Sequence, residues 1–187
     1  YLGDFDALYG YTKEWARTQL YMDRMSKPVV AAVNGMALGG GLELAIRCHG
    51  IVALNKTMFQ FPEITLGILP GIGGSIVPYR RWPAGAGQFH DMLLSGKPLF
   101  AQAAHEAGMV SALAEDYGSL IQAAVKEVET LKDNLPGIPD GRVEIPPVEV
   151  PESPVSGKLP LSKEAVSITA ETIEEGCRAE TFAEALE

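Results

Sequence analysis

Two glutamates stand beside two glycine-rich turns within residues 27–75, and this pairing is where the sequence could carry out chemistry. Glu43 follows the triple glycine 39–41, and Glu63 precedes a second turn over residues 67–74. A glycine-rich turn that ends a strand and opens a helix exposes backbone N–H groups, which can hold an anion or a developing oxyanion. Two carboxylates at the mouth of such a turn can divide proton donation and proton acceptance between them. The residues therefore predict acid–base chemistry beside an oxyanion hole.

The pattern of apolar residues predicts the elements that position these turns. A short continuous apolar run is typical of a strand buried on both faces. Such runs cover residues 29–33, 51–54 and 58–61. Helices are expected over residues 5–25, 42–48, 88–94, 101–107 and 117–131. Because strand, helix and strand follow one another at this spacing, the sequence predicts an α/β unit with parallel strands.

The composition changes after residue 133. Residues 134–160 hold seven of the chain's thirteen prolines, which excludes a continuous helix and favours an extended segment. Helical periodicity resumes from Ser162, a helix cap, to Leu186. One face of that helix is apolar and contains Val166, Ala170, Ile173 and Cys177. We therefore expect a core over residues 1–133, an extended connection over 134–160 and a helical segment over 161–187.

Composition bounds the class of protein. The 187 residues fit one domain or a large part of one, and although 47% are hydrophobic, no apolar run approaches the ~20 residues that cross a bilayer. The start at Tyr1 shows no signal-peptide pattern. Cys48 and Cys177 stand far apart and form neither a metal spacing nor a disulfide framework. We therefore expect a reduced, cytoplasmic setting and no membrane partner.

The charge excludes one class of partner. A net charge of -9 argues against nucleic acid, because phosphate contacts need clustered Lys and Arg. The pair Arg80-Arg81 is interpreted as a helix surface feature rather than a phosphate site.

Three motifs stand in register along the chain: KPVVAAVNGMALGGGLEL, FPEITLGILPGIGG and LSGKPLFAQAAHEAGMV. In order and spacing they resemble the enoyl-CoA hydratase/isomerase (crotonase) family, over about Pro28 to Val110. The resemblance implies an α/β crotonase (ClpP-like) fold of repeated ββα units with a C-terminal helical trimerisation region. The family's opening strands would precede residues 5–25, so the chain is interpreted as a fragment lacking them.

The resemblance also implies a reaction. Members bind an acyl-CoA thioester so that its carbonyl oxygen meets two backbone N–H groups, which stabilise an enolate; no metal or organic cofactor is implied, since coenzyme A is part of the substrate. In family hydratases, the position of Glu43 helps to activate water at the β-carbon, and that of Glu63 delivers a proton to the α-carbon. Gly40 matches one oxyanion donor, and the other is expected at or just before Tyr1. Around this centre, the expected substrate-binding residues are Gly39, Gly41, Phe61, Pro62, Leu66 and Gly71.

Structural interpretations stand beside these roles. Glu43 in the first turn of a helix would be favoured by the macrodipole by about 0.3 to 1 kcal/mol, and Glu63 would suit a solvated loop. Gly40 would allow close helix–strand packing, a role compatible with donating a hydrogen bond. The match in register favours catalysis for both glutamates.

Three functions follow from this reading. The first is hydration of trans-2-enoyl-CoA thioesters, favoured because family isomerases often keep only the carboxylate at the Glu63 position. The alternatives are an enoyl-CoA isomerase or other crotonase-type CoA-ester lyase, and a non-catalytic oligomerisation portion of a multienzyme. The Pro-rich segment resembles a region of multifunctional proteins that fuse a hydratase to a 3-hydroxyacyl-CoA dehydrogenase.

Assembly as a homotrimer or hexamer is also expected. It would use the helices after Ser95 and the helix from Ser162 to Leu186. The apolar face of that last helix has too little remaining chain to cover it within one subunit.

Overall fold

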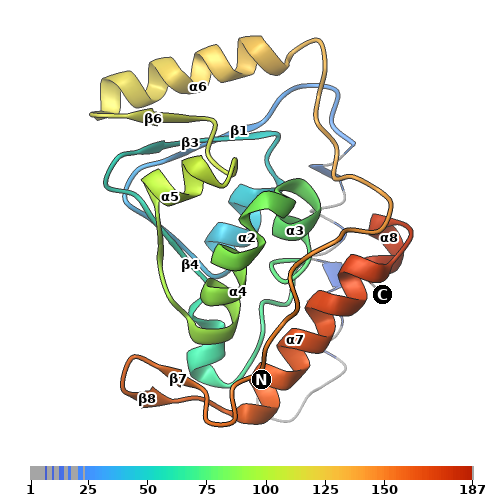
Figure 1. Cartoon of the computed structure of the whole chain (residues 1–187). Coiled ribbons are helices and arrows are strands. Elements are labelled where there is room, and N and C mark those ends of the chain that lie inside the picture. The colour runs from blue at the N-terminus through green and yellow to red at the C-terminus, as the bar shows by residue number, and fades with distance from the viewer. Residues whose placement is uncertain are drawn as a thin grey trace.

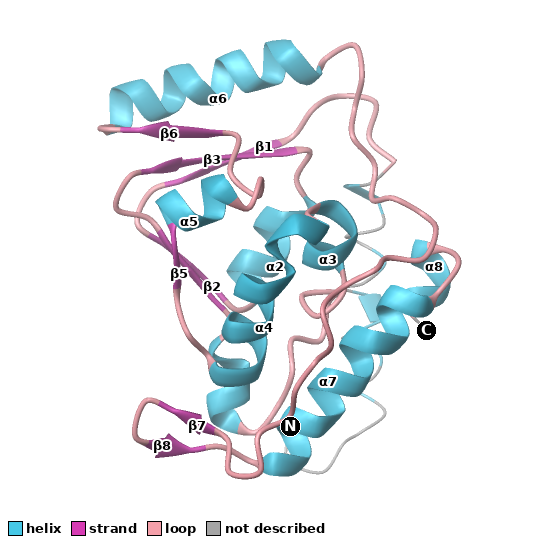
Figure 2. Cartoon of the chain, in the orientation of Figure 1, coloured by secondary structure: helices cyan, strands magenta, loops and turns pink. Residues whose placement is uncertain are grey.

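Two small sheets and the helices packed against them carry the glycine-rich turns (Figure 1, Figure 2). The computed structural model describes residues 24–186, together with Ala7, Gly10, Lys13, Glu14, Arg17, Tyr21 and Met22. In chain order, the elements are β1 (Val30–Val33), β2 (Met36–Leu38), α2 (Gly40–Arg47), β3 (Gly50–Leu54), β4 (Met58–Gln60), the 3-10 helix η1 (Pro62–Leu66), α3 (Val77–Arg81), the 3-10 helix η2 (Pro83–Gly85), α4 (Ala86–Ser95), β5 (Leu99–Phe100), α5 (Ala101–Glu106), β6 (Ala112–Ala114), α6 (Tyr117–Leu131), β7 (Val155–Ser156), β8 (Leu159–Pro160), α7 (Lys163–Arg178) and α8 (Phe182–Ala185).

The chain alternates between the two sheets, which produces the expected ββα repeat. The first sheet has the order β1-β3-β6 with parallel pairs, and the second has the order β2-β4-β5, in which β2 and β4 are parallel and β5 is antiparallel. Each passage from the first sheet to the second, β1 to β2 and β3 to β4, is followed by helix. Figure 1 shows α6 lying over the first sheet, while α2, α3 and α4 lie between the sheets and α7.

Most predicted elements are confirmed, with boundaries shifted by a few residues. The three strands and the helices within residues 30–131 lie where the apolar runs placed them. The sequence reading missed β2, a strand of only three residues, which follows β1 after a sharp turn at Gly35, where φ is +107°. The helix expected over residues 5–25 lies largely outside the described residues. Of those described there, the ones from Ala7 to Met22 are helical, whereas Arg24 and Met25 are not.

The Pro-rich connection is extended, as predicted. From residue 143 to residue 150 its apolar side chains pack partly buried against the main core while their neighbours are exposed. The connection ends in the short β7–β8 hairpin, which the proline pattern did not indicate. The boundaries at residues 133 and 160 stay a prediction, since one core includes side chains from both sides of them.

The C-terminal helix departs from the prediction. Ser162 does cap it, with its Oγ accepting a hydrogen bond from the Ala165 N–H at 3.2 Å. However, α7 ends at Arg178, and a separate short helix, α8, follows an extended residue, Ala179. The reason lies in Arg80, whose Nη2 donates to the carbonyls of Gly176 (2.8 Å) and Ala179 (2.8 Å) and so satisfies the end of the helix.

Arg80 also corrects the interpretation of the Arg80-Arg81 pair as a surface feature. Only 2% of Arg80 is exposed, and its Nη1 donates to the carbonyls of Pro139 and Gly141, each at 3.0 Å. It therefore ties α3 to both the Pro-rich connection and α7. Arg81 is partly buried and donates to the carbonyls at the end of α2, among them Ile46 at 2.8 Å.

The apolar face of α7 is covered within the chain itself. The four residues of that face are all buried in the main hydrophobic core: Val166, Ala170, Ile173 and Cys177. This face therefore does not need a second subunit to cover it, and that prediction is wrong. α7 packs against α4 and α8 instead. Within the described residues, no helix is both long and apolar enough to cross a membrane.

Candidate active site

Glu43 is held by the second glycine-rich turn. It lies in the first turn of α2, only 2% exposed, and its Oε1 accepts hydrogen bonds from the N–H groups of Ile72 (2.7 Å) and Gly74 (3.0 Å). The two glycine turns, distant in sequence, are thereby joined through one carboxylate. Because backbone donors fix Glu43 directly, its carboxylate has a defined position.

Glu63 lies against the first glycine-rich turn. It stands in η1, and its Oε1 would be only 2.6 Å from a Cβ atom at Gly39. Gly39 also has a φ of +50°, so no side chain fits there without strain. Its N–H donates to the Gln60 carbonyl (2.9 Å), and its carbonyl accepts from the Glu43 N–H (2.9 Å). Gly39 thus accepts a hydrogen bond from the backbone of Glu43 and leaves room for the side chain of Glu63.

Burial and neighbouring charges shift the pKa values of both carboxylates. Burial raises the pKa of Glu43, against the hydrogen bonds from Ile72 and Gly74 and the positive charge of Arg47. Burial also raises the pKa of Glu63, and the negative charge of Glu43 raises it further. Glu63 Oε2 is buried and meets no hydrogen-bond donor among the described residues. Such an oxygen is suited to carry a proton for transfer.

The remaining predicted residues fall into two groups. Gly40 and Gly41 begin α2 and are exposed, and the N–H of Gly40, at the first helical position, has no acceptor within the helix. Pro62 opens η1, and Leu66, which ends it, is 74% exposed beside Glu63.

Phe61 and Gly71 differ in their exposure to solvent. Phe61 is fully buried, and its ring would be 2.9 Å from a Cβ atom at Gly74, so it supports the second turn from the core. Gly71 is exposed and lines a cavity of about 590 Å³ on the other side of that turn. The structure thus brings Glu43, Glu63 and Gly39 together and places Phe61 behind them.

Sequence reasoning missed Arg47 and the donors in the second turn. Arg47 is buried on α2, four residues after Glu43, and the positive charge of its guanidinium acts on that glutamate. Spacing of four residues on a helix puts two side chains on one face, so this signal was available. The N–H donors of Ile72 and Gly74 carry no side-chain signal. Among the described residues, no group of three or more His, Cys, Asp or Glu side chains could hold a metal ion.

The chain belongs to the enoyl-CoA hydratase/isomerase family, whose sequence profile matches residues 5–138. It is 46% identical over 94 residues to the peroxisomal fatty acid beta-oxidation multifunctional protein AIM1 of Arabidopsis thaliana, covering 49% of this chain and 12% of that protein. It is 47% identical over 97 residues to the 2,3-dehydroadipyl-CoA hydratase of Escherichia coli K12, covering 52% of this chain and 36% of that one.

The fold is the crotonase fold. The chain superposes on the crystal structure of an enoyl-CoA hydratase from Bacillus anthracis with a TM-score of 0.62 and 29% identity, covering 70% of this chain and 50% of that one. The chain therefore spans half or less of the length of each of these relatives.

Proposed function

We propose that the protein hydrates trans-2-enoyl-CoA thioesters to 3-hydroxyacyl-CoA. The observation that carries the proposal is a pair of carboxylates beside the glycine turns. Glu43 is buried and bound to the second turn, and Glu63 is partly buried and packs against Gly39, with its Oε2 buried. A hydratase needs two proton-transferring groups, one at water and one at the α-carbon. The names of relatives that are enoyl-CoA hydratases support the same reaction.

The proposed step begins with Glu43 ionised and Glu63 protonated. Glu43 takes a proton from water while the water oxygen bonds to the β-carbon, and the π electrons move toward the thioester oxygen. The N–H of Gly40 stabilises the enolate oxygen, and Glu63 then gives a proton to the α-carbon. The reaction uses no metal or organic cofactor, because coenzyme A arrives as part of the substrate.

The two-carboxylate geometry also favours hydratase over isomerase. An isomerase moves one proton between two carbons and can use a single carboxylate. Here a second carboxylate, Glu43, is close enough for its charge to raise the pKa of Glu63. A role limited to oligomerisation would leave the buried Glu43 carboxylate and the buried Oε2 of Glu63, both costly to remove from water, without a task.

The test follows the absorbance of the conjugated thioester after adding the protein to crotonyl-CoA and longer homologues, without any cofactor. We expect the absorbance to fall. Unchanged absorbance with every chain length would contradict the hydratase proposal. A shift of the double bond without addition of water, detected by mass spectrometry, would favour the isomerase.

We further propose a homotrimer or hexamer, now on different evidence. α6 exposes an apolar stripe at spacings of four, four and three residues, formed by Tyr117, Ile121, Val125 and Val128. Sedimentation should show three or six times the monomer mass, and Ile121→Asp with Val125→Asp should lower it, while Gln122→Asp on the neighbouring face should not. A fully active monomer at micromolar concentration would contradict this assembly.

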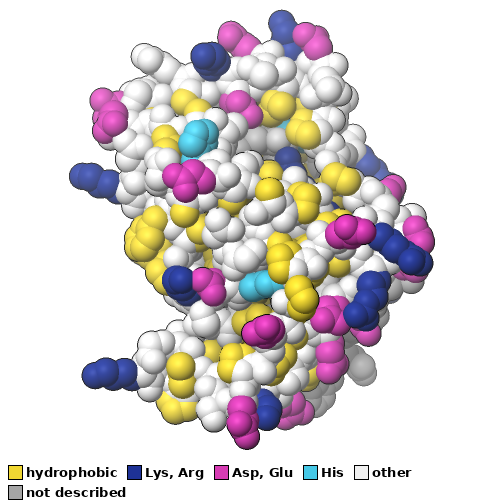
Figure 3. Space-filling view, in the orientation of Figure 1, with side chains coloured by type: hydrophobic (Ala, Val, Ile, Leu, Met, Phe, Trp, Pro, Cys, Tyr) yellow, Lys and Arg dark blue, Asp and Glu magenta, His cyan; other side chains and the backbone are white. Residues whose placement is uncertain are grey.

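We propose a cytoplasmic location. We also propose that the protein has no nucleic-acid partner, because Figure 3 shows Lys and Arg side chains spread over the visible face and interspersed with acidic ones. Fusion to a 3-hydroxyacyl-CoA dehydrogenase is supported by the relatives named multifunctional proteins.

A further inference from the structure

Arg47 and Glu43 contact the same turn from one face of α2. Arg47 is 3% exposed, and its Nη1 would be 3.7 Å from a Cβ atom at Gly73. Gly73 stands between the two residues, Ile72 and Gly74, whose N–H groups hold Glu43 Oε1. The turn therefore packs against the guanidinium while it binds the carboxylate.

The C-terminal helix α8 covers Arg47. The guanidinium carbon of Arg47 lies 4.7 Å from the centroid of the Phe182 ring, a distance at which a cation is attracted to the ring face. Phe182 is itself buried, and its N–H donates to Asp140 Oδ1 at 2.7 Å. α8 is thereby tied to the Pro-rich connection and holds Arg47 in place.

We propose that Arg47, held by Phe182, is a positioning residue that packs against the Ile72–Gly74 turn and favours the charged form of Glu43. The inference rests on the proposed function, in which Glu43 accepts a proton from water. It adds a consequence: the C-terminal helix, far from the two glutamates in sequence, acts on the hydration step through one buried arginine.

The charges around Glu43 determine the sign of the expected effect. Arg47 faces it from α2 and Glu63 from η1, while Glu175, Arg178 and Glu184 line the cavity beyond the turn.

Of these groups, Arg47 is the cation that lowers the pKa of Glu43, against the larger opposite effect of burial. Removing its charge therefore raises that pKa, so Glu43 stays protonated to higher pH. The acid limb of kcat should move to higher pH in the same direction, because only the ionised carboxylate accepts a proton.

The direct test is a pH titration of the Glu43 side-chain carboxyl in the 187-residue chain by carbon-13 NMR, with Glu43→Gln used to assign the signal. Arg47→Met keeps most of the side-chain volume and removes the charge, so the titration should shift to higher pH. Arg47→Lys keeps the charge and should shift it less. An unchanged Glu43 titration in Arg47→Met would overturn the proposal.

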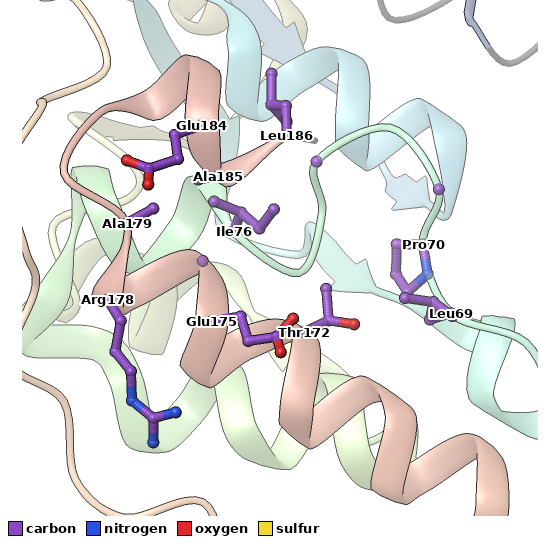
Figure 4. Close-up of a pocket in the computed structure, with 13 residues that line it drawn as sticks. Leu69, Pro70, Ile76, Thr172, Glu175, Arg178, Ala179, Glu184, Ala185 and Leu186 are labelled. Atoms are coloured by element: carbon purple, nitrogen blue, oxygen red, sulfur yellow. The ribbon is translucent and has the colours of Figure 1, made fainter.

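Arg178→Met is the matched control. Arg178 also lines the cavity, but its side chain is 71% exposed and pairs with Glu174, and Figure 4 shows it extending away from Ile76 and Leu186. Its loss should leave the Glu43 titration where it is. An equal shift in both variants would show a general charge effect and would also overturn the proposal.

Phe182→Leu tests the role of Phe182 and covers the case in which Arg47→Met does not fold. It removes the cation–π contact and keeps an apolar residue, so the Glu43 titration should move upward by less than in Arg47→Met. With crotonyl-CoA it should lower kcat at acidic pH with KM nearly unchanged. An unmoved Glu43 titration in a folded Phe182→Leu variant would refute the role of Phe182.

Failure of the proposed function remains distinguishable. If the protein hydrates no enoyl-CoA, the hydratase proposal fails, yet the NMR titrations still decide whether Arg47 controls the charge of Glu43.

Discussion

The second glycine turn and the C-terminal segment both depend on a buried charged side chain, and they use it in opposite ways. Glu43 accepts two backbone N–H groups through one oxygen, and near it the Oε2 of Glu63 meets no donor among the described residues. Arg80 instead donates to four backbone carbonyls through its two terminal nitrogens. The carboxylate pair keeps capacity for a reacting group, whereas the two terminal nitrogens of the arginine hold segments together.

This difference separates residues whose loss should stop the reaction from residues whose loss should weaken the fold. A buried charge with spare hydrogen-bonding capacity is costly unless a ligand or proton completes it. A buried charge that satisfies several carbonyls stabilises the elements that carry them. The predictions below test that separation.

The largest effect is expected from the two glutamates. Glu63→Gln should lower hydration by roughly 10²-fold or more and abolish solvent exchange of the α-proton, because the proton donor is gone. Glu43→Gln should suppress hydration comparably while leaving part of the exchange. Hydration is followed by thioester absorbance and exchange by deuterium incorporation.

Unfolding in urea provides the control for this pair, since neither change should lower stability enough to explain the loss. Equal losses of hydration and exchange in both variants would contradict the division of roles.

Arg80→Met should instead destabilise the fold. It leaves the carbonyls of Pro139, Gly141, Gly176 and Ala179 without their donor, at a cost of about 3 kcal/mol in the free energy of unfolding. The measurement is the urea midpoint at constant slope. Arg178→Met, which removes an exposed pair with Glu174, should cost under about 1 kcal/mol. Equal urea midpoints for the two variants would show that the hydrogen bonds of Arg80 do not stabilise the fold.

Gly39→Ala should lower both the hydration activity and the stability of the fold, because the Glu63 side chain packs against Gly39. The added methyl would lie 2.6 Å from Glu63 Oε1 at a φ of +50°, which costs about 1–2 kcal/mol in backbone strain alone. Hydration should also fall, since Glu63 must move.

Gly87→Ala in α4 is the matched control. Its Cβ meets nothing within 4 Å, so it should leave hydration intact and stabilise the helix slightly. A Gly39→Ala variant as active as wild type would place Glu63 elsewhere.

The smallest effect is expected from Ile173→Val on α7. Removing one buried methyl group should cost about 0.5–1.5 kcal/mol with no change in kcat or KM, because α7 is held by packing. Ile168→Val, on the exposed side of the same helix, should be near neutral. A change in KM for Ile173→Val alone would mean that α7 shapes the substrate site.

Much of this arrangement was predictable because its signals are local. The bounds of α6 were predicted as observed, and the capping side chain of Ser162 was recognised, since periodicity and caps act within a few residues. β2 was not found because three residues cannot show a period. The end of α7 was missed because its cause, Arg80, comes from a distant helix.

The sequence by itself determined which residues could react: two glutamates, each next to a glycine turn, in a family recognisable from three motifs. Only the tertiary structure decided how those carboxylates are charged. The donors to Glu43 lie 29 and 31 residues away, and the ring that covers Arg47 comes from α8. A side chain's type is written in the chain, but its pKa depends on burial and on neighbours that folding alone brings within a few ångströms.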